Sequence, residues 1–311
     1  MPPDGIKALL PVPSRLAKIK AQRDSELRAI LEGADKRKII IIGPCSADNE
    51  DAVCDYVSQL GNLVKEVSDK LFIIPRIYTA KPRTKGGGYM GMQHTQEGFL
   101  NLRRMHIRAA IESGLTAADE LLYPDNYAYL DDILTYTTVG ARSCENQQHR
   151  LVASGLDIPV GFKNPISGDL TALLNSIAAA QTPNEFKYGE FEVKTSGNPY
   201  AHAVLRGGAN APNYTDATAF FEQYRKSRLK NPAIIIDAAH GNSGKDADRQ
   251  IDIAREVMVC KAVKGVMIES YLEDGVQPED GKIYGKSITD PCIGWIKTEK
   301  LILELAKTPI I

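Results

Sequence analysis

Eight short apolar runs, each followed by a helix-like stretch, constrain the fold of this chain more than any other feature. The runs are rich in β-branched residues and lie at 39–43, 71–78, 118–123, 137–142, 159–164, 201–208, 233–240 and 264–272. Continuous apolar runs of this length are typical of strands buried on both faces of a parallel sheet. Amphipathic stretches with apolar residues at helical spacing accompany them, for example at 49–67, 98–113, 216–228 and 298–306. Eight strand–helix units predict an α/β fold, a single (β/α)8 (TIM) barrel, with a doubly wound open sheet as the structural alternative.

Two segments lie outside this repeat. Residues 1–37 precede the first strand and contain a charged, helix-like piece, and residues 186–198 are typical of an inserted β-hairpin. We therefore expect a short N-terminal arm over 1–37 and one catalytic barrel over 38–311. The arm and hairpin either plug and decorate the barrel or form an oligomer contact or regulatory surface, and the sequence leaves both alternatives open.

Composition excludes several classes of protein. The 311 residues are 43% hydrophobic and 25% charged with a net charge of −1, which argues against general nucleic-acid affinity. No apolar run approaches the roughly 18 residues of a membrane span, and the start of the chain does not resemble a signal peptide. Five scattered cysteines without CxxC spacing indicate reduced thiols. These features predict a cytoplasmic protein without a membrane or nucleic-acid partner.

Every predicted strand ends on a cysteine, a histidine or a charged residue. In barrels of this kind, chemistry collects at the carboxyl ends of the strands. Each such residue alone would be an ordinary solvated loop residue, but eight in series predict a functional rim. In chain order they are Cys45, Arg76, Glu120, Arg142, Lys163, Arg206, Asp237 with His240, and Glu269.

Cations form one part of this rim. Arginine forks bind phosphate and carboxylate oxygens bidentately, and lysine adds a point charge. Six cations on one rim of a nearly neutral protein predict a positive cleft and strongly anionic substrates. The six are Arg76, Arg142, Lys163 and Arg206, with Lys81 and Arg83 from the sequence AKPRT.

The other part of the rim resembles a metal site. Cys45, His240, Glu269 and Asp290 offer one sulfur, one nitrogen and two carboxylate donors. A mixed set of this kind suits a borderline divalent ion such as Mn, Fe, Co or Zn. The four residues are far apart in the sequence, so their meeting depends on the barrel. The remaining histidines have no partner at ligand spacing and are expected to be structural or exposed: His94, His106, His149 and His202.

Seven motifs then resemble those of one enzyme family. GPCS, RIYTAKPRT, GARSCENQQHR, GFKN, LRGG, DAAHGNS and YGKSITDPCIGW occur in this order. Over about residues 37–306 the chain resembles the type I 3-deoxy-D-arabino-heptulosonate 7-phosphate (DAHP) synthases. The resemblance implies condensation of phosphoenolpyruvate (PEP) with erythrose 4-phosphate and release of phosphate, the first step of the shikimate pathway towards chorismate and the aromatic amino acids. The alternative is a sibling PEP-condensing aldolase that uses another aldose phosphate.

The resemblance also implies a role for each matching residue. Cys45, His240, Glu269 and Asp290 correspond to ligands of one divalent metal ion per subunit, Mn²⁺ first, with Fe²⁺, Co²⁺ or Zn²⁺ as alternatives. Our hypothesis for the catalytic groups is that Lys81 supplies a proton to the new alkoxide and that Glu120 and His240 help to handle the water. Relatives form homodimers or homotetramers. The substrate-binding positions are Arg76, Lys81, Pro82, Arg83, Thr84, Glu120, Ala141, Arg142, Lys163, Arg206 and Asp237.

Some positions depart from the family pattern. Many relatives have Gly-Glu where this chain has Asp119-Glu120, and an aspartate where it has Tyr123. The loop that follows KPRT also differs, and its glycine-rich piece lacks the ending of a P-loop. The arm and the hairpin are shorter than in members inhibited by aromatic amino acids, so we expect weak or no inhibition of this chain.

Overall fold

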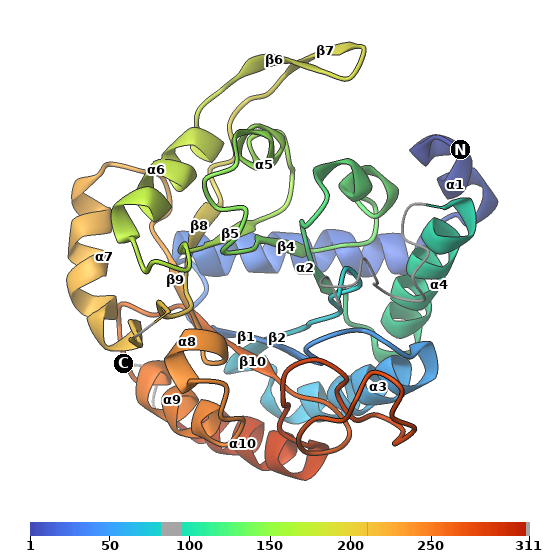
Figure 1. The fold of residues 1–311 in the computed structure, drawn as a ribbon, viewed down its shortest axis with the longest axis vertical. Helices are drawn as coiled ribbons and strands as arrows, with labels where there is room; N and C mark the ends of the chain where they lie inside the picture. The colour runs from blue at the N-terminus through green and yellow to red at the C-terminus, as the bar shows by residue number, and fades with distance from the viewer. Residues whose placement is uncertain (82–94, 210, 309–311) are drawn as a thin grey trace.

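A parallel barrel forms the centre of the computed structural model, which describes residues 1–81, 95–209 and 211–308 (Figure 1). Its strands lie in the order β2-β1-β10-β9-β8-β5-β4-β3. A further bridge pairs Arg76 with Ala118, and the Ile77 N–H donates to the Ala118 carbonyl at 2.9 Å, which joins β2 to β3. The predicted (β/α)8 barrel is confirmed, and its strands are β1 (Lys38–Gly43), β2 (Leu71–Pro75), β3 (Ala118–Glu120), β4 (Tyr136–Val139), β5 (Val160–Lys163), β8 (Ala201–Leu205), β9 (Ile234–Asp237) and β10 (Gly265–Glu269).

Helices surround the barrel, as Figure 1 shows. In α3 (Glu50–Val67), the Asn49 side chain accepts from the Ala52 N–H and so caps the first turn. The same helix buries Val53, Val57 and Leu60 at helical spacing, as the sequence predicts. The others are α4 (Gln96–Ser113), α5 (Gln147–Ala153), α6 (Leu170–Gln181), α7 (Ala217–Lys226), α8 (His240–Ser243), α9 (Arg249–Met258) and α10 (Trp295–Lys307), with 3₁₀ turns η2 (Pro124–Tyr129) and η3 (Tyr214–Asp216).

The N-terminal arm contains α1 (Pro3–Leu9) and α2 (Ser14–Glu32). Helix α2 runs across the end of the barrel where the strands begin (Figure 1). Its buried residues Leu27, Ile30 and Leu31 join the cluster of side chains that fills the barrel interior. Arg23 of α2 is also buried, and its guanidinium lies 4.4 Å from the centre of the Phe72 ring. Helix α2 therefore closes the amino end of the barrel.

The inserted hairpin consists of β6 (Glu185–Tyr188) and β7 (Phe191–Lys194), paired antiparallel. It projects away from the barrel (Figure 1), and the Phe191 side chain at its turn is 74% exposed. The hairpin is confirmed, and it spans 185–194 where the sequence predicts 186–198. Among the described helices, none is long and apolar enough to cross a membrane.

Candidate active site

The turn after β1 carries Cys45 into the mouth of the barrel. Gly43 ends this strand, and a Cβ atom there would lie 2.2 Å from the Arg76 carbonyl oxygen, so no side chain fits. The Cys45 sulfur lies 3.4 Å from both the Lys81 ammonium and the Asp290 N–H. The thiol is fully buried and packs within the apolar core cluster, and its sulfur also contacts these polar groups. The sequence prediction that Cys45 belongs to a site is consistent with this arrangement.

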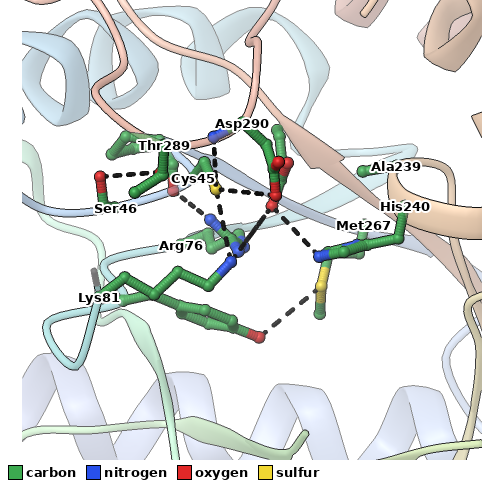
Figure 2. Close-up of polar contacts among 12 residues, drawn as sticks. Cys45, Ser46, Arg76, Lys81, Ala239, His240, Met267, Thr289 and Asp290 are labelled. Carbon is green, nitrogen blue, oxygen red and sulfur yellow. Dashed lines mark hydrogen bonds and ion pairs between the residues drawn. The ribbon is translucent and has the colours of Figure 1, made fainter. Parts of the chain in front are cut away.

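Three of the four proposed metal ligands, from distant parts of the chain, meet at this thiol, and the fourth, His240, contacts one of them. Donor atoms of Cys45, Glu269 and Asp290 all lie within 4.8 Å of one another. His240 Nε2 lies 3.8 Å from Glu269 Oε1. Figure 2 shows Lys81 and His240 approaching this centre from opposite sides. The three clustered donors, with the His240 nitrogen beside Glu269, are the ligand types that suit a single divalent ion of the borderline class.

The charges around Glu269 keep its carboxylate ionised. Arg76 Nη2 lies 3.0 Å and Lys81 Nζ 3.7 Å from Glu269 Oε1. Burial alone would raise the pKa of Glu269, but His240, Lys81 and Arg76 outweigh it and bring this pKa down to about 2. Burial, with the Glu269 charge, raises the pKa of the Cys45 thiol. A bound cation favours the thiolate, so metal binding at this site would release a proton.

His240 is held by Asp237, the last residue of β9. His240 Nδ1 lies 3.2 Å from Asp237 Oδ1, which leaves Nε2 directed towards Glu269. A carboxylate on one ring nitrogen of a metal-binding histidine commonly fixes its tautomer. His240 also has a φ of +54°, a value that non-glycine residues seldom adopt, so its neighbours must hold it there.

Glycines bring the loop after β8 against the loop after β9. A Cβ atom on Gly241 would lie 2.3 Å from the Gly208 carbonyl oxygen, and one on Gly207 would lie 2.5 Å from the Gly241 carbonyl carbon. This close backbone contact explains the glycines of LRGG and HGN. It also places Arg206 and His240 beside the same cavity.

A cavity of about 470 Å³ opens above the ligand cluster at the carboxyl end of the barrel. Arg76, Asp237, Cys45 and Glu269 lie outside its lining, fully or almost fully buried. Pro82, Arg83, Thr84 and the glycine-rich loop lie outside the described residues. The predicted site residues that line the cavity are Lys81, Glu120, Ala141, Arg142, Lys163, Arg206, His240 and Asp290.

Lys163 and Arg76 share one supporting surface, the ring of the buried Tyr78. The Arg76 guanidinium lies 3.8 Å and the Lys163 ammonium 5.8 Å from the ring centre. Lys163 Nζ also lies 2.7 Å from Asp237 Oδ2. Burial lowers the pKa of Lys163 to about 8, although Asp237 acts in the opposite direction. Lys163 is therefore charged at neutral pH, but its pKa of about 8 lies close to neutral pH.

Five lining residues were not predicted from the sequence. Among them, Lys245 brings a further cation into the cavity and lies 2.9 Å from Asp290 Oδ1. The nearest pattern in the sequence is HGNSGK, in which Lys245 follows His240 by five residues. The others depend on how long loops fold over the barrel mouth, and two of them lie in the motif YGKSITDPCIGW directly before Asp290. The four are Ile166, Glu279, Ile288 and Thr289.

The fold and this site together define a class of protein. A TIM barrel with several cations around a cavity, above a buried cluster of sulfur, nitrogen and carboxylate donors, has the features of an enzyme for phosphorylated, anionic substrates. Residues 17–303 match the model of the DAHP synthetase I family, and the chain belongs to this family.

Full-length relatives agree with that membership. The chain is 37% identical to a Phe-sensitive phospho-2-dehydro-3-deoxyheptonate aldolase of Escherichia coli, over 98% of this chain and 93% of the relative. It is 35% identical to a Tyr-sensitive aldolase of the same name from Salmonella typhimurium, over 99% of this chain and 92% of the relative. A solved structure of such an aldolase from Francisella tularensis superimposes with a TM-score of 0.92 at 29% identity, covering 99% of this chain and 96% of that chain.

Proposed function

We propose that this chain condenses PEP with erythrose 4-phosphate to give DAHP and inorganic phosphate. The observation that carries the proposal is the cavity itself, whose lining beside the ligand cluster includes four cations, Lys81, Arg142, Lys163 and Arg206. Both substrates are anions that repel each other, and only a strongly positive site would hold them in contact. Membership of the DAHP synthetase I family supports the same reaction.

A divalent ion held by Cys45, His240, Glu269 and Asp290 would supply Lewis acidity to the aldehyde of erythrose 4-phosphate. Mn²⁺ is the ion we propose first, and Fe²⁺, Co²⁺ and Zn²⁺ also suit the donors. The chain's own residues prepare this site, since Asp237 orients His240, and Arg76 and Lys81 lie beside the ionised Glu269 carboxylate.

In the proposed mechanism, Arg142, Lys163 and Arg206 bind the phosphate and carboxylate of PEP. C3 of PEP attacks the aldehyde carbon, water adds at C2, and phosphate leaves by cleavage of the C–O bond. Lys81 lies at the boundary between cavity and ligand cluster, where it would donate a proton to the new alkoxide oxygen. Glu120 also lines the cavity, and we assign it to handling the proton of the attacking water.

The test is an assay of phosphate release from PEP, with and without erythrose 4-phosphate. The enzyme is stripped with EDTA and assayed before and after addition of Mn²⁺. Release that requires both substrates and the metal would support the reaction and the metal site together. Release with a different aldose phosphate, but none with erythrose 4-phosphate, would contradict the proposed substrate and favour a sibling aldolase.

We also propose a cytoplasmic homodimer or homotetramer, built from the arm of residues 1–37 and the barrel of 38–311. All five cysteines are free thiols, in keeping with a reducing compartment. The hairpin supports self-association, because a projecting two-stranded ribbon with an exposed Phe191 is seldom left uncovered. Light scattering after size-exclusion chromatography would contradict this if the protein eluted as a monomer at micromolar concentration.

A further inference from the structure

A buried carboxylate that the mechanism above does not use lies directly behind the active site. Asp119 is in the middle of β3, and its side chain is almost completely buried. Its Oδ1 accepts from the Thr79 N–H at 3.0 Å and from the Glu120 N–H at 2.7 Å. Its Oδ2 accepts from the Thr79 hydroxyl at 2.6 Å and lies 3.4 Å from His106 Nε2.

These interactions come from three separate parts of the fold. Thr79 is in the loop after β2, Glu120 is the next residue of β3, and His106 projects from α4. A buried carboxylate is costly unless its oxygens are hydrogen-bonded, and charge-assisted bonds of this kind are among the stronger ones. Asp119 therefore links the loop, the strand and the helix through the hydrogen bonds of one carboxylate.

Two of the groups bonded to Asp119 belong to, or lie next to, the cavity residues to which we assign proton transfer, Lys81 and Glu120. Thr79 is two residues before Lys81, and Glu120 is bonded to Asp119 through its own backbone. Lys81 and Glu120 both line the cavity. One carboxylate oxygen, Asp119 Oδ1, accepts from both backbone segments and so fixes the distance between them.

We propose that Asp119 is a positioning residue that sets Lys81 and Glu120 at the separation needed for reaction. The inference rests on the proposed function, because it assumes that these two groups act on the same pair of substrates. Asp119 touches neither the cavity nor the ligand cluster, so it acts only through its neighbours. A shift of about 1 Å in a reacting group is enough to reduce turnover about 100-fold.

Three variants of graded severity test this inference. Asp119→Ala removes every hydrogen bond that the carboxylate makes. Asp119→Asn keeps one oxygen for the two backbone N–H groups. Thr79→Val removes only the hydroxyl bond at nearly constant shape. The matched control is Asp24→Asn at the opposite end of the barrel, where Asp24 also accepts from a threonine hydroxyl, that of Thr135.

Turnover should fall further as more of the hydrogen bonds to the Asp119 carboxylate are removed. We expect kcat to fall about 100-fold in Asp119→Ala and about threefold to tenfold in Thr79→Val, with Asp119→Asn between them. Bound Mn²⁺ and the Kd for PEP, measured without erythrose 4-phosphate, should stay within about threefold of wild type in all three variants. A role confined to stability would instead lower Tm and leave kcat of the folded fraction unchanged.

The outcomes separate this inference from the proposed function. A wild-type enzyme that fails to condense the two substrates refutes the proposed function before any variant is read. An active wild type with Asp119→Ala within about threefold in kcat overturns the positioning role. If Asp119→Ala does not fold, Thr79→Val decides, and a wild-type kcat in that variant also overturns it. A kcat loss of equal size in Asp24→Asn would do the same.

Discussion

The two ends of the barrel are built from the same eight strands but are filled in opposite ways. At the amino end, Leu27 and Ile30 of α2 complete an apolar interior. At the carboxyl end, Arg76, Asp237 and Glu269 are just as buried, although they carry charge. The amino end therefore gains stability from burial alone, whereas each charge at the carboxyl end depends on its partner.

This difference predicts that the amino end of the barrel serves mainly stability and the carboxyl end mainly function. Apolar side chains tolerate small shifts in their neighbours, so a loss at the amino end should cost folding free energy without changing the chemistry. Charged side chains that are buried in pairs leave an uncompensated group when one partner is removed. A loss at the carboxyl end should therefore change binding and turnover first.

The largest effect is expected for Lys81→Ala at the carboxyl end. This change removes the proposed proton donor and one of the cations beside Glu269, so kcat should fall by a factor of at least about 10³. Metal content, measured by atomic emission, should remain that of wild type. The control at the amino end is Lys20→Ala, which removes a lysine paired with Asp24 at 2.5 Å and should leave kcat unchanged. Survival of turnover within about tenfold in Lys81→Ala would refute the role.

The next effect is expected for Leu27→Ala at the amino end. Leu27 is fully buried in α2, and truncating a buried leucine costs about 2–5 kcal/mol of unfolding free energy. Urea denaturation of wild type and variant measures this cost, and kcat at 25 °C should not change. The control is Leu9→Ala, because Leu9 is 56% exposed and its truncation should cost little. A large loss of kcat in Leu27→Ala without a loss of stability would refute the separation of the two ends.

A smaller effect is expected for Asp237→Asn, which affects both parts of the site. An asparagine keeps one acceptor oxygen but loses the negative charge that Asp237 places beside both His240 and Lys163. We expect the Kd for Mn²⁺ to rise about 10–100-fold in a chelator competition. PEP should also bind more weakly, because the loss of Asp237 removes the charge that raises the pKa of Lys163. Unchanged affinity for both ligands would show that Asp237 is only a packing residue.

The pH dependence should be about tenfold per unit above pH 8. Burial holds the pKa of Lys163 at about 8, so its ammonium is present below that pH and is lost as the pH rises through it. The kcat/KM for PEP should therefore fall as the pH rises above about 8. In Lys163→Arg this fall should begin at a higher pH, because arginine stays charged. A wild-type profile that is flat to pH 9.5 would contradict the assignment.

The sequence was sufficient to predict the barrel and to predict which residues lie at the carboxyl ends of its strands. Buried strands leave continuous apolar runs, and parallel strands all end on the same side, so residues such as Lys163 and Glu269 could be placed together without knowing the structure. The arm was less clear, because a charged helix such as α2 buries only one stripe of residues, and its place at the amino end depends on the finished barrel.

Other interactions could not be predicted from the sequence, because they join residues that only the folded chain brings together. Asp119 and Thr79 are 40 positions apart, and although Thr79 lies in the motif RIYTAKPRT, no pattern in the sequence pairs it with Asp119. Lys245 and Thr289 reach the cavity only because the loops after β9 and β10 fold over it. His106 was expected to be structural or exposed, and it is a buried structural residue of α4.

The smallest expected effect is that of aromatic amino acids, which should leave the activity almost unchanged. Beside the arm, a cavity of about 510 Å³ is lined by Asp24, Asp131, Asp132 and Asp157. Its lysines are already paired, Lys7 with Asp131 and Lys20 with Asp24, each at 2.5 Å.

An amino-acid carboxylate entering this cavity would therefore meet mostly negative charge. Steady-state rates with 1 mM phenylalanine, tyrosine or tryptophan should stay within about 20% of the rate without them, since a carboxylate facing like charge gains no differential binding. Strong inhibition below that concentration would refute the prediction. It would also give the amino end of the barrel a role in function as well as in stability.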